Sequence, residues 1–442
     1  MTKNLHETED STLTKLKVWD VCVIGAGPAG MMSAGHAAGS GASVILLEKN
    51  KRPGEKLLIT GGGRCNVTNA ETNVREFLMR YKESDKFLFS AFSQFSSSDT
   101  LEFFNSRGVP TKVENEGRVF PQSNSAESIW NVMLDFVKES GVKIETNAVV
   151  AKISIENESV ENSRSDKKIK SVVLKNGKEI FAKKFILATG GTSRPETGST
   201  GDGFPWLKKL GHTLIESESA LVPLRIKESW VKKLQGITLT NIKISTFQNN
   251  VKQDVSKGKI LFTHFGVTGP TVLNMSKDIG ELLKYGEVKI KIDLLPSDDH
   301  AVLNKKLQDL FTEDANKKIK NSLGSLVPSA IVEPILTLSD ISGEIKNNSI
   351  SKEARMKLIE VIKGLEMEVV GLLGNDKAVV SSGGVSLEEI DFKTMRSKIV
   401  ENLYLVGDVL NIDRPSGGYS LQLCWTTGFV AGNDAGKREP RG

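Results

Sequence analysis

The sequence predicts an α/β protein in which a Rossmann-type nucleotide-binding domain is interrupted by a mainly β insert and a small helical unit. Three observations support this prediction. A strand, glycine turn, helix and second strand occupy residues 20–48, alternating strand-like stretches fill the middle of the chain, and an apolar strand runs into Gly-Asp near the end. Because the α/β pattern opens and closes the chain, we expect both ends to form one domain.

The first unit, residues 20–48, has the features of a dinucleotide-binding fingerprint. Gly25, Gly27 and Gly30 form G-x-G-x-x-G between an apolar strand and a helix. The first glycine allows the tight turn, the second lets the backbone approach a pyrophosphate, and the third lets the helix lie close to the sheet. The helix N-terminus presents free N–H groups to the phosphates. Glu48 ends the second strand, where a carboxylate binds ribose hydroxyls and disfavours a 2′-phosphate.

The remaining chain divides into regions of different pattern. Residues 18–195 are α/β and 196–298 are mainly β, whereas 299–365 carry Leu, Lys, Glu and Ile at helical spacing. Residues 366–442 return to the α/β pattern and complete the first domain. Individual elements are predicted as a helix over 126–140 and strands over 142–155, 169–174, 242–247, 259–263 and 287–293.

Composition excludes several classes of protein. The 442 residues are 38% hydrophobic and carry a net charge of +5, and no apolar run approaches the ~20 residues of a membrane helix. Residues 1–17 are polar, which predicts a disordered tail rather than a signal peptide. Cys22, Cys65 and Cys424 are widely spaced, which indicates a reducing cytoplasm without a disulfide framework. Since no dense basic run has interleaved aromatic residues, we do not expect a nucleic-acid partner.

Two further motifs indicate a flavin. Residues 185–191, FILATGG, are an apolar strand entering a glycine turn. Residues 403–408, LYLVGD, are followed by a loop and then Gly417, Gly418 and Tyr419, which open an apolar helix. The Asp408 carboxylate is predicted to bond a ribityl hydroxyl, and the helix dipole to stabilise charge on the reduced flavin. Motifs at both ends of the chain are what the long FAD molecule requires.

A third element lies at residues 54–69, GEKLLITGGGRCNVTN. Its three consecutive glycines permit backbone approach to a flat ring or a phosphate. Lys56 and Arg64 are candidate charge partners for FAD. Cys65 has no C-x-x-C partner, so we interpret it as a small packed residue rather than a redox thiol.

The sequence therefore predicts non-covalent FAD, with NAD(P)H as a transient reductant only, because no second dinucleotide fingerprint is present. Such a reductant would dock on the flavin face or in the insert. The predicted cofactor-binding residues come from the motifs above and their flanks: Gly25, Gly27, Pro28, Ala29, Gly30, Glu48, Lys49, Lys56, Gly63, Arg64, Cys65, Asn66, Val149, Ala188, Thr189, Gly190, Gly407, Asp408, Gly418, Tyr419 and Ser420.

No catalytic residue can be assigned from the sequence. His264 is either a proton donor or a histidine bonded by the backbone of the insert. Arg118 meets either an anionic substrate or flavin, or it forms a structural salt bridge. We find no metal-ligand cluster and no Ser-His-Asp arrangement, and flavin chemistry requires neither because the cofactor carries the reaction.

Several segments together resemble bacterial FAD-dependent oxidoreductases related to bile-acid-pathway reductases and aminoacetone oxidases. They are residues 54–69, 117–121 (GRVFP), 198–203 (GSTGDG), 263–270 (THFGVTGP), 382–385 (SGGV) and 407–432. The resemblance implies a glutathione-reductase-type FAD domain interrupted by a small β-barrel and a helical subdomain. The chain departs from the family at Ser420, where Asn is usual, and at Asn411 and Asp408, where acids and Glu are common.

Three functions follow as hypotheses. The first is an FAD-dependent oxidoreductase that passes a hydride between NAD(P)H or a small organic substrate and an enone-like acceptor or oxygen. The second is a flavin-dependent RNA-modifying protein, suggested by the isoelectric point of 8.8. The third is a non-catalytic flavoprotein. The sequence indicates neither the substrate nor the oligomeric state.

Overall fold

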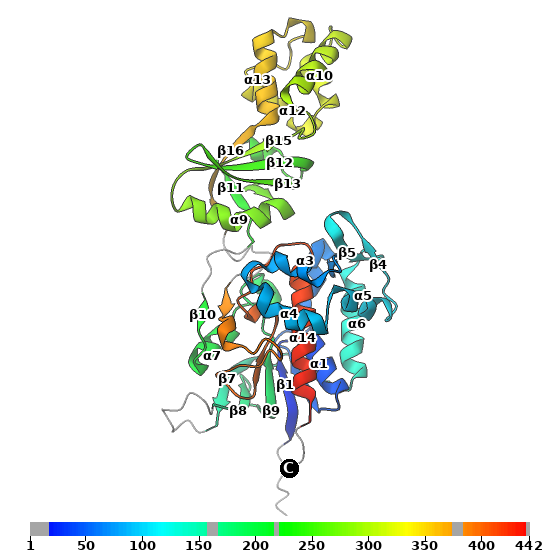
Figure 1. Ribbon diagram of the computed structural model, residues 1–442, viewed down its shortest axis with the longest axis vertical. Helices are drawn as coiled ribbons and strands as arrows, with labels where there is room; N and C mark the ends of the chain where they lie inside the picture. Colours follow the sequence, from blue (N-terminus) through cyan, green and yellow to red (C-terminus); the bar gives the residue numbers. More distant parts are fainter. Residues whose placement is uncertain (1–16, 157–166, 216–220, 374–382, 439–442) are drawn as a thin grey trace, which may run out of the picture.

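The computed structural model describes residues 17–156, 167–215, 221–373 and 383–438. Figure 1 shows two bodies stacked along the long axis. The cofactor domain, which holds both ends of the chain, forms the lower body, and a barrel carrying a helical tip forms the upper one. The predicted tail lies outside the described residues except for Lys17, and most of the polar loop after residue 156 lies outside them too.

The cofactor domain is built on a seven-stranded sheet with the order β6–β2–β1–β9–β8–β7, in which β18 also pairs with β9. Strands β6, β2, β1, β9 and β18 are parallel, and β7 and β8 are antiparallel additions. Their bounds are β1 Val18–Ile24, β2 Val44–Leu47, β6 Lys143–Glu145, β7 Val150–Ile155, β8 Ile169–Leu174, β9 Glu179–Leu187 and β18 Leu403–Leu405.

The parallel strands end in one row. Leu47 and Leu187 both pair with Ile24, and Leu405 pairs with Leu187. The segments that follow these four residues therefore leave the sheet side by side. This register brings the widely separated motifs to one carboxyl edge, where ligands of open α/β sheets bind.

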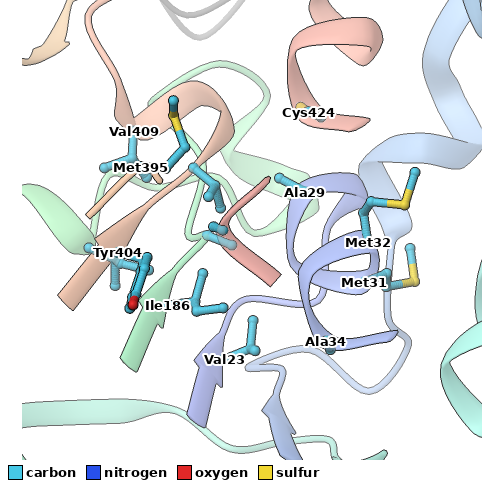
Figure 2. Packing of buried hydrophobic residues seen from close by; sticks show 14 of the residues in the cluster. Val23, Ala29, Met31, Met32, Ala34, Ile186, Met395, Tyr404, Val409 and Cys424 are labelled. Atoms are coloured by element: carbon cyan, nitrogen blue, oxygen red, sulfur yellow. The ribbon is translucent and has the colours of Figure 1, made fainter. Parts of the chain in front are cut away.

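Helices α1 (Pro28–Gly39) and α14 (Tyr419–Gly436) pack on this sheet in front of β1 and β9 (Figure 1). They lie unusually close together, because a stripe of glycines on α14 faces α1. A Cβ at Gly428, Gly432 or Gly436 would lie 2.5–2.7 Å from a backbone oxygen of α1. Figure 2 shows the core beneath, where Val23, Ile186 and Tyr404 line up across three adjacent strands.

The rest of the cofactor domain covers the sheet and its upper edge. A small antiparallel sheet has the order β3–β5–β4 and lies toward the barrel. The elements are β3 Thr68–Asn69, β4 Thr111–Val113, β5 Arg118–Pro121, β10 Leu214–Ile215, β17 Gly384–Val385, α2 Glu55–Ile59, α3 Val74–Leu78, α4 Asp85–Gln94, α5 Ser97–Asn105, α6 Ala126–Glu139 and α7 Gly203–Leu210.

The upper body is a closed barrel with the order β11–β14–β13–β12–β15–β16. Helix α9 (Pro270–Leu283) lies on its lower side, toward the cofactor domain (Figure 1). The remaining elements are β11 Leu224–Ile226, α8 Trp230–Lys233, β12 Thr238–Gln248, β13 Val251–Thr263, β14 Gly266–Thr268, β15 Val288–Asp293 and β16 Leu365–Leu372.

The helical tip lies between β15 and β16 in sequence. It contains α10 His300–Glu313, α11 Ile319–Ser322, α12 Val332–Leu338 and α13 Lys352–Lys363. Its buried residues belong to the same hydrophobic cluster as those of the barrel, from Leu224 to Val369. Barrel and tip therefore share one core, separate from the core of the cofactor domain.

Most predicted elements are confirmed, with differences at the boundaries. The helix over 126–140 is α6, but the predicted strand 142–155 is broken into β6 and β7 by a turn with Asn147 at φ 55°. The barrel begins at Leu224 rather than at 196, and α9 within it was not predicted. Strand β16 closes the barrel instead of opening the C-terminal part, because its alternating buried residues fit a half-buried barrel strand.

Candidate active site at the sheet edge

Two adjoining cavities lie at the carboxyl edge of the sheet. The strand-edge cavity runs along the ends of the parallel strands, from Glu48 to Asp408. The interdomain cavity, with a volume of about 760 Å³, lies between the cofactor domain and the barrel. Lys56 lines both cavities. A long ligand in the first can therefore end at the boundary of the second.

The three fingerprint glycines fit a bound pyrophosphate. Gly25 has φ +100°, and a Cβ there would lie 2.5 Å from the Ala188 oxygen. A Cβ at Gly30 would lie 1.8 Å from the Gly25 oxygen. At Gly27, by contrast, a Cβ would meet nothing within 4 Å, because this residue faces the strand-edge cavity. Gly27 is also the N-cap of α1 and provides no side-chain cap, so the first N–H groups remain available to an anion.

Glu48 lies beside this turn. Its Oε2 accepts a hydrogen bond from the Ala26 N–H at 3.0 Å, and its Oε1 accepts one from the Asn50 N–H at 2.8 Å. Burial raises the pKa of Glu48, and these two backbone N–H groups oppose part of the rise. The carboxylate is thus fixed with acceptor capacity left for ribose hydroxyls.

Thr189 and Lys49 add two further polar groups to the lining of this cavity. Thr189 Oγ1 is buried without a hydrogen-bond partner and lines the cavity. Lys49 Nζ donates to Thr200 Oγ1 at 2.6 Å and to Asp202 Oδ2 at 2.8 Å, and so closes the rim. Thr200 and Asp202 were not predicted as site residues, although the sequence GSTGDG that contains them had been noted.

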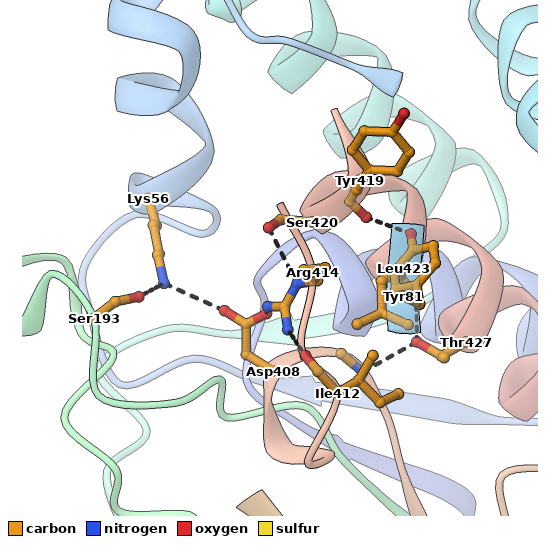
Figure 3. A network of polar contacts seen from close by, with 11 residues as sticks. Lys56, Tyr81, Ser193, Asp408, Ile412, Arg414, Tyr419, Ser420, Leu423 and Thr427 are labelled. Carbon is orange, nitrogen blue, oxygen red and sulfur yellow. Dashed lines mark hydrogen bonds and ion pairs between the residues drawn. The ribbon is translucent and has the colours of Figure 1, made fainter. Parts of the chain in front are cut away.

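At the far end, Asp408 belongs to a buried polar network (Figure 3). Its carboxylate is paired with Arg414 and lies 3.5 Å from Lys56 Nζ, which also donates to Ser193 Oγ at 2.6 Å. Burial works to raise the pKa of Asp408, but the charges of Arg414 and Lys56 outweigh it and hold the pKa below its usual value. Arg414 Nη1 donates to the Ile412 oxygen at 2.6 Å. Arg414 was not predicted as a site residue, although it lies only six residues after Asp408 in the segment 407–432.

The interdomain cavity lies at the N-terminus of α14. The N-cap, Gly418, has φ +102° and no side-chain cap, and a Cβ there would lie 2.2 Å from the Thr68 oxygen. Tyr419 and Ser420 in the first turn line the cavity. Lys257 and Asn274 line it from the barrel side. The helix dipole thus points toward a space bounded by both bodies.

Several cations line this cavity, and they differ in their partners. Arg64 is paired with Glu114 and lies 4.1 Å above the Phe120 ring. Arg118 Nε donates to the Asn115 oxygen at 3.1 Å and lies 3.6 Å from Glu116. Among the described residues, Arg80 and Lys257 have no carboxylate partner. The cavity therefore offers positive charge to an anionic ligand.

The structure brings most of the predicted residues to the two cavities. Gly25, Gly27, Pro28, Ala29, Glu48, Lys49, Val149, Ala188, Thr189, Gly190 and Asp408 line the strand-edge cavity, and Arg64, Asn66, Gly418, Tyr419 and Ser420 line the interdomain cavity. Gly30, Gly63, Cys65 and Gly407 line neither. His264 lies exposed in the β13–β14 turn and also lines neither.

A largely buried cluster of a serine, a histidine and a glutamate lies away from both cavities. Ser397 Oγ lies 3.0 Å from His212 Nε2, and His212 Nδ1 lies 3.1 Å from Glu389, which is a Ser-His-Glu arrangement. The Ser397 hydroxyl also accepts hydrogen bonds from the Ile399 and Val400 N–H groups, and its residue is buried. These bonds occupy the oxygen, so the arrangement is structural. His212 lies far from Ser397 and Glu389 in the sequence, so no local motif indicated this cluster.

The HI0933-like protein Rossmann domain matches residues 19–434. The chain belongs to this family. It is 29% identical over 419 residues to a 3-dehydro-bile acid delta(4,6)-reductase of Clostridium scindens, covering 94% of the chain and 98% of that protein. It is also 27% identical over 416 residues to a ribosomal RNA dihydrouridine synthase of Escherichia coli, with 94% and 98% covered. A synthase of the same description from Haemophilus influenzae is 29% identical.

Solved flavoenzymes share the fold of this HI0933-like chain. A 3-ketosteroid delta1-dehydrogenase from Sterolibacterium denitrificans has a TM-score of 0.54 at 13% identity, covering 95% of the chain and 99% of that protein. A flavocytochrome c3 fumarate reductase has a TM-score of 0.53 at 19% identity, with 95% and 78% covered. Together with the family, these likenesses identify an FAD-binding Rossmann fold of mixed α/β type.

The HI0933-like chain is therefore an FAD-dependent oxidoreductase, and the non-catalytic flavoprotein is not supported. The residues around the strand-edge cavity fit FAD, because Gly27, Glu48 and Thr189 present an open backbone, a carboxylate and an unpartnered hydroxyl to it. In the described ranges, no helix has the length and hydropathy to cross a membrane, and no three His, Cys, Asp or Glu side chains gather as a metal site would require.

Proposed function

We propose that this protein reduces a carbon–carbon double bond conjugated to a carbonyl group, with non-covalent FAD as the hydride carrier. The observation that carries this proposal is the interdomain cavity. It shares Lys56 with the strand-edge cavity and contains the N-terminus of α14. A flavin ring at that helix would occupy part of this cavity of about 760 Å³ and leave the remainder for a second molecule.

The named relatives support the type of acceptor. A delta(4,6)-reductase of a 3-dehydro-bile acid reduces double bonds near an oxo group, and a dihydrouridine synthase yields a uridine with a saturated ring bond. Both acceptors are enone-like. Hydride addition places negative charge on the carbonyl oxygen, and cations together with a helix N-terminus stabilise such charge.

The test is anaerobic reduction of the holoenzyme by NADH or NADPH, followed by separate addition of a cyclic enone, a 3-oxo-4-ene steroid acid or oxygen. We expect the enone-type acceptors to reoxidise the flavin faster than oxygen does, and the product to gain two hydrogens. Reoxidation by oxygen alone would contradict the proposal and indicate an oxidase.

A second candidate is reduction of uridine in RNA, favoured by the two ribosomal RNA dihydrouridine synthases. The cationic cavity supports it, and residues 221–297 hold twice as many Lys and Arg residues as Asp and Glu residues. Phosphates bind such surfaces with strong salt dependence.

This candidate is tested with reduced enzyme and a uridine-containing RNA, with dihydrouridine measured by mass spectrometry. Lys257→Gln should weaken RNA turnover at low salt while leaving reduction of an uncharged enone within about twofold. Equal turnover of RNA by wild type and Lys257→Gln would contradict a role for Lys257 in binding the RNA.

A further inference from the structure

The interdomain cavity contains one phenol, that of Tyr419. Reduction of a conjugated double bond needs a proton as well as a hydride. Of the other lining groups, the guanidinium groups do not give up a proton and Glu116 is paired with Arg118, which leaves the ammonium groups of Lys56 and Lys257. Lys56 is already engaged by Ser193 and Asp408. This leaves Tyr419, on the cofactor-domain side, and Lys257, on the barrel.

The Tyr419 side chain is held in place from several sides. It is the first residue of α14, directly after the Gly418 N-cap. Its ring centroid lies 4.9 Å from that of Phe77 and 6.0 Å from that of Tyr81, in an edge contact. The Tyr81 hydroxyl donates to the Tyr419 backbone oxygen at 2.8 Å (Figure 3). The phenol is thus presented to the cavity by the same helix start that faces the flavin position.

The Tyr419 hydroxyl has a cation beside it. Arg80, from the segment after α3, lines the same cavity, and its positive charge acts to lower the pKa of the Tyr419 phenol. Arg80 has no carboxylate partner among the described residues. A guanidinium in this position stabilises a phenolate without itself giving up a proton.

We propose that Tyr419 donates the proton that completes reduction of the conjugated acceptor, and that Arg80 holds the negative charge left on its oxygen. This inference rests on the proposed function. FAD that NAD(P)H has reduced would supply the hydride that adds to the carbon remote from the carbonyl. The Tyr419 O–H bond breaks, its proton joins the carbon next to the carbonyl, and the enolate electrons form that new C–H bond. The phenolate then takes a proton from solvent.

The protonation state agrees with this role. Burial raises the pKa of Tyr419, and the Arg80 charge opposes part of that rise. The phenol is therefore protonated at neutral pH, as a donor must be. Replacing Arg80 with an uncharged residue removes this opposing charge, so the phenolate becomes less stable and the pKa of Tyr419 rises further.

The test separates the two half-reactions of the holoenzyme. Tyr419→Phe keeps the ring and its packing but removes the proton. We expect flavin reduction and reoxidation by oxygen within about threefold of wild type, and reoxidation by an enone roughly 100-fold slower. Arg80→Met should slow the enone step by roughly tenfold. The high-pH limb of the wild-type enone rate should be absent in Tyr419→Phe.

A readout independent of turnover uses the four tyrosines of the chain. In the oxidised holoenzyme, tyrosinate absorbance against pH should lose one titrating group in Tyr419→Phe, and Arg80→Met should move that group to higher pH. Tyr285→Phe is the control. It removes an exposed phenol that lines neither cavity, and should leave the enone step within about threefold.

The outcomes are distinguishable. If no conjugated acceptor reoxidises the wild-type flavin, the proposed function fails and this inference with it. If wild type reduces the enone and Tyr419→Phe does so within fivefold, only the inference fails. A 100-fold loss in Lys257→Gln with Tyr419→Phe unaffected would assign the proton to the barrel ammonium and would also overturn it.

Discussion

The strand-edge cavity and the interdomain cavity are built by different means. The first is shaped by backbone: glycines, helix N-termini and strand ends whose order follows from sheet register. The second is shaped by side chains from distant segments, such as Arg80, Arg118 and Lys257. Backbone geometry binds what many enzymes share, whereas side chains determine what one enzyme selects. Substitutions in the strand-edge cavity should therefore affect FAD binding, and substitutions in the interdomain cavity should affect the reaction with the acceptor.

The largest expected effect is at Gly27. The Cβ of a Val side chain there would meet no protein atom within 4 Å, and the side chain would occupy the open space of the strand-edge cavity. We expect Gly27→Val to fold and to bind no measurable FAD, because the pyrophosphate loses its place. The measurements are flavin absorbance after purification and circular dichroism.

Gly39→Val is the matched control. This glycine lies at the exposed end of the same helix, and a Cβ there also meets nothing within 4 Å. It should retain FAD. Full FAD in Gly27→Val would contradict the view that this cavity is a backbone-built cofactor site.

Asp408 tests the link between cofactor and network. Asp408→Ala should weaken FAD binding by roughly ten- to a hundredfold, because a charged hydrogen bond is lost. It also leaves the buried Arg414 guanidinium unpaired, since its side chain is 1% exposed. We expect about 3–5 kcal/mol lower stability. Titration with FAD and urea unfolding measure the two effects, and activity should return with excess FAD.

The double variant Asp408→Ala/Arg414→Met separates these contributions. Removing both charges should recover much of the stability while FAD affinity stays low. An Asp408→Ala protein that retains full FAD yet cannot turn over would show instead that Asp408 acts in the chemistry.

Acid should destabilise the cofactor domain through His36 on α1. This ring lies between Phe136 and Phe429, and burial, followed by the nearby Arg107, lowers its pKa from 6.5 to about 4. As pH falls from 6.5 to 4, the unfolded chain binds a proton that the folded one does not. Stability therefore falls in this window, by about 3 kcal/mol at ~1.36 kcal/mol per unit.

Urea unfolding at pH 7 and pH 4.5 measures this loss. His36→Leu should make it smaller, whereas His300→Gln, at an exposed position on α10, should leave it in place. An unchanged pH dependence in His36→Leu would contradict the assignment.

The smallest effect is expected at Cys65, which is fully buried and lines neither cavity. Burial raises the pKa of its thiol to about 12, so no thiolate is available at neutral pH. Cys65→Ser should keep activity within about threefold and cost about 1 kcal/mol of stability. A loss of flavin reoxidation beyond ~100-fold would identify a redox thiol.

The residues of the strand-edge cavity could be predicted from the sequence far better than those of the interdomain cavity. Gly25, Glu48 and Asp408 stand next to strands and helices whose local pattern gives their position. Arg80 lies in no motif, and only folding brings it near Tyr419. Arg414 lies six residues after Asp408, but the loop between them has no periodic pattern that predicts where its side chain points. Likewise, the alternating pattern of 365–372 was visible, but its partner strands lie far away in sequence.

The contact of the α14 glycines with α1 also fixes the distance between the N-termini of the two helices. Gly428 meets Ala29 in the first turn of α1, so the segment from Tyr419 to Gly428 projects beyond that helix. At about 1.5 Å per residue, the N-termini of the two helices are about 12 Å apart along parallel axes. A mononucleotide would therefore reach only one of these helix N-termini, whereas a dinucleotide is long enough to reach both. One residue inserted before Gly428 would rotate the N-terminus of α14 by about 100° relative to α1, so that the two helix ends would no longer face the same ligand.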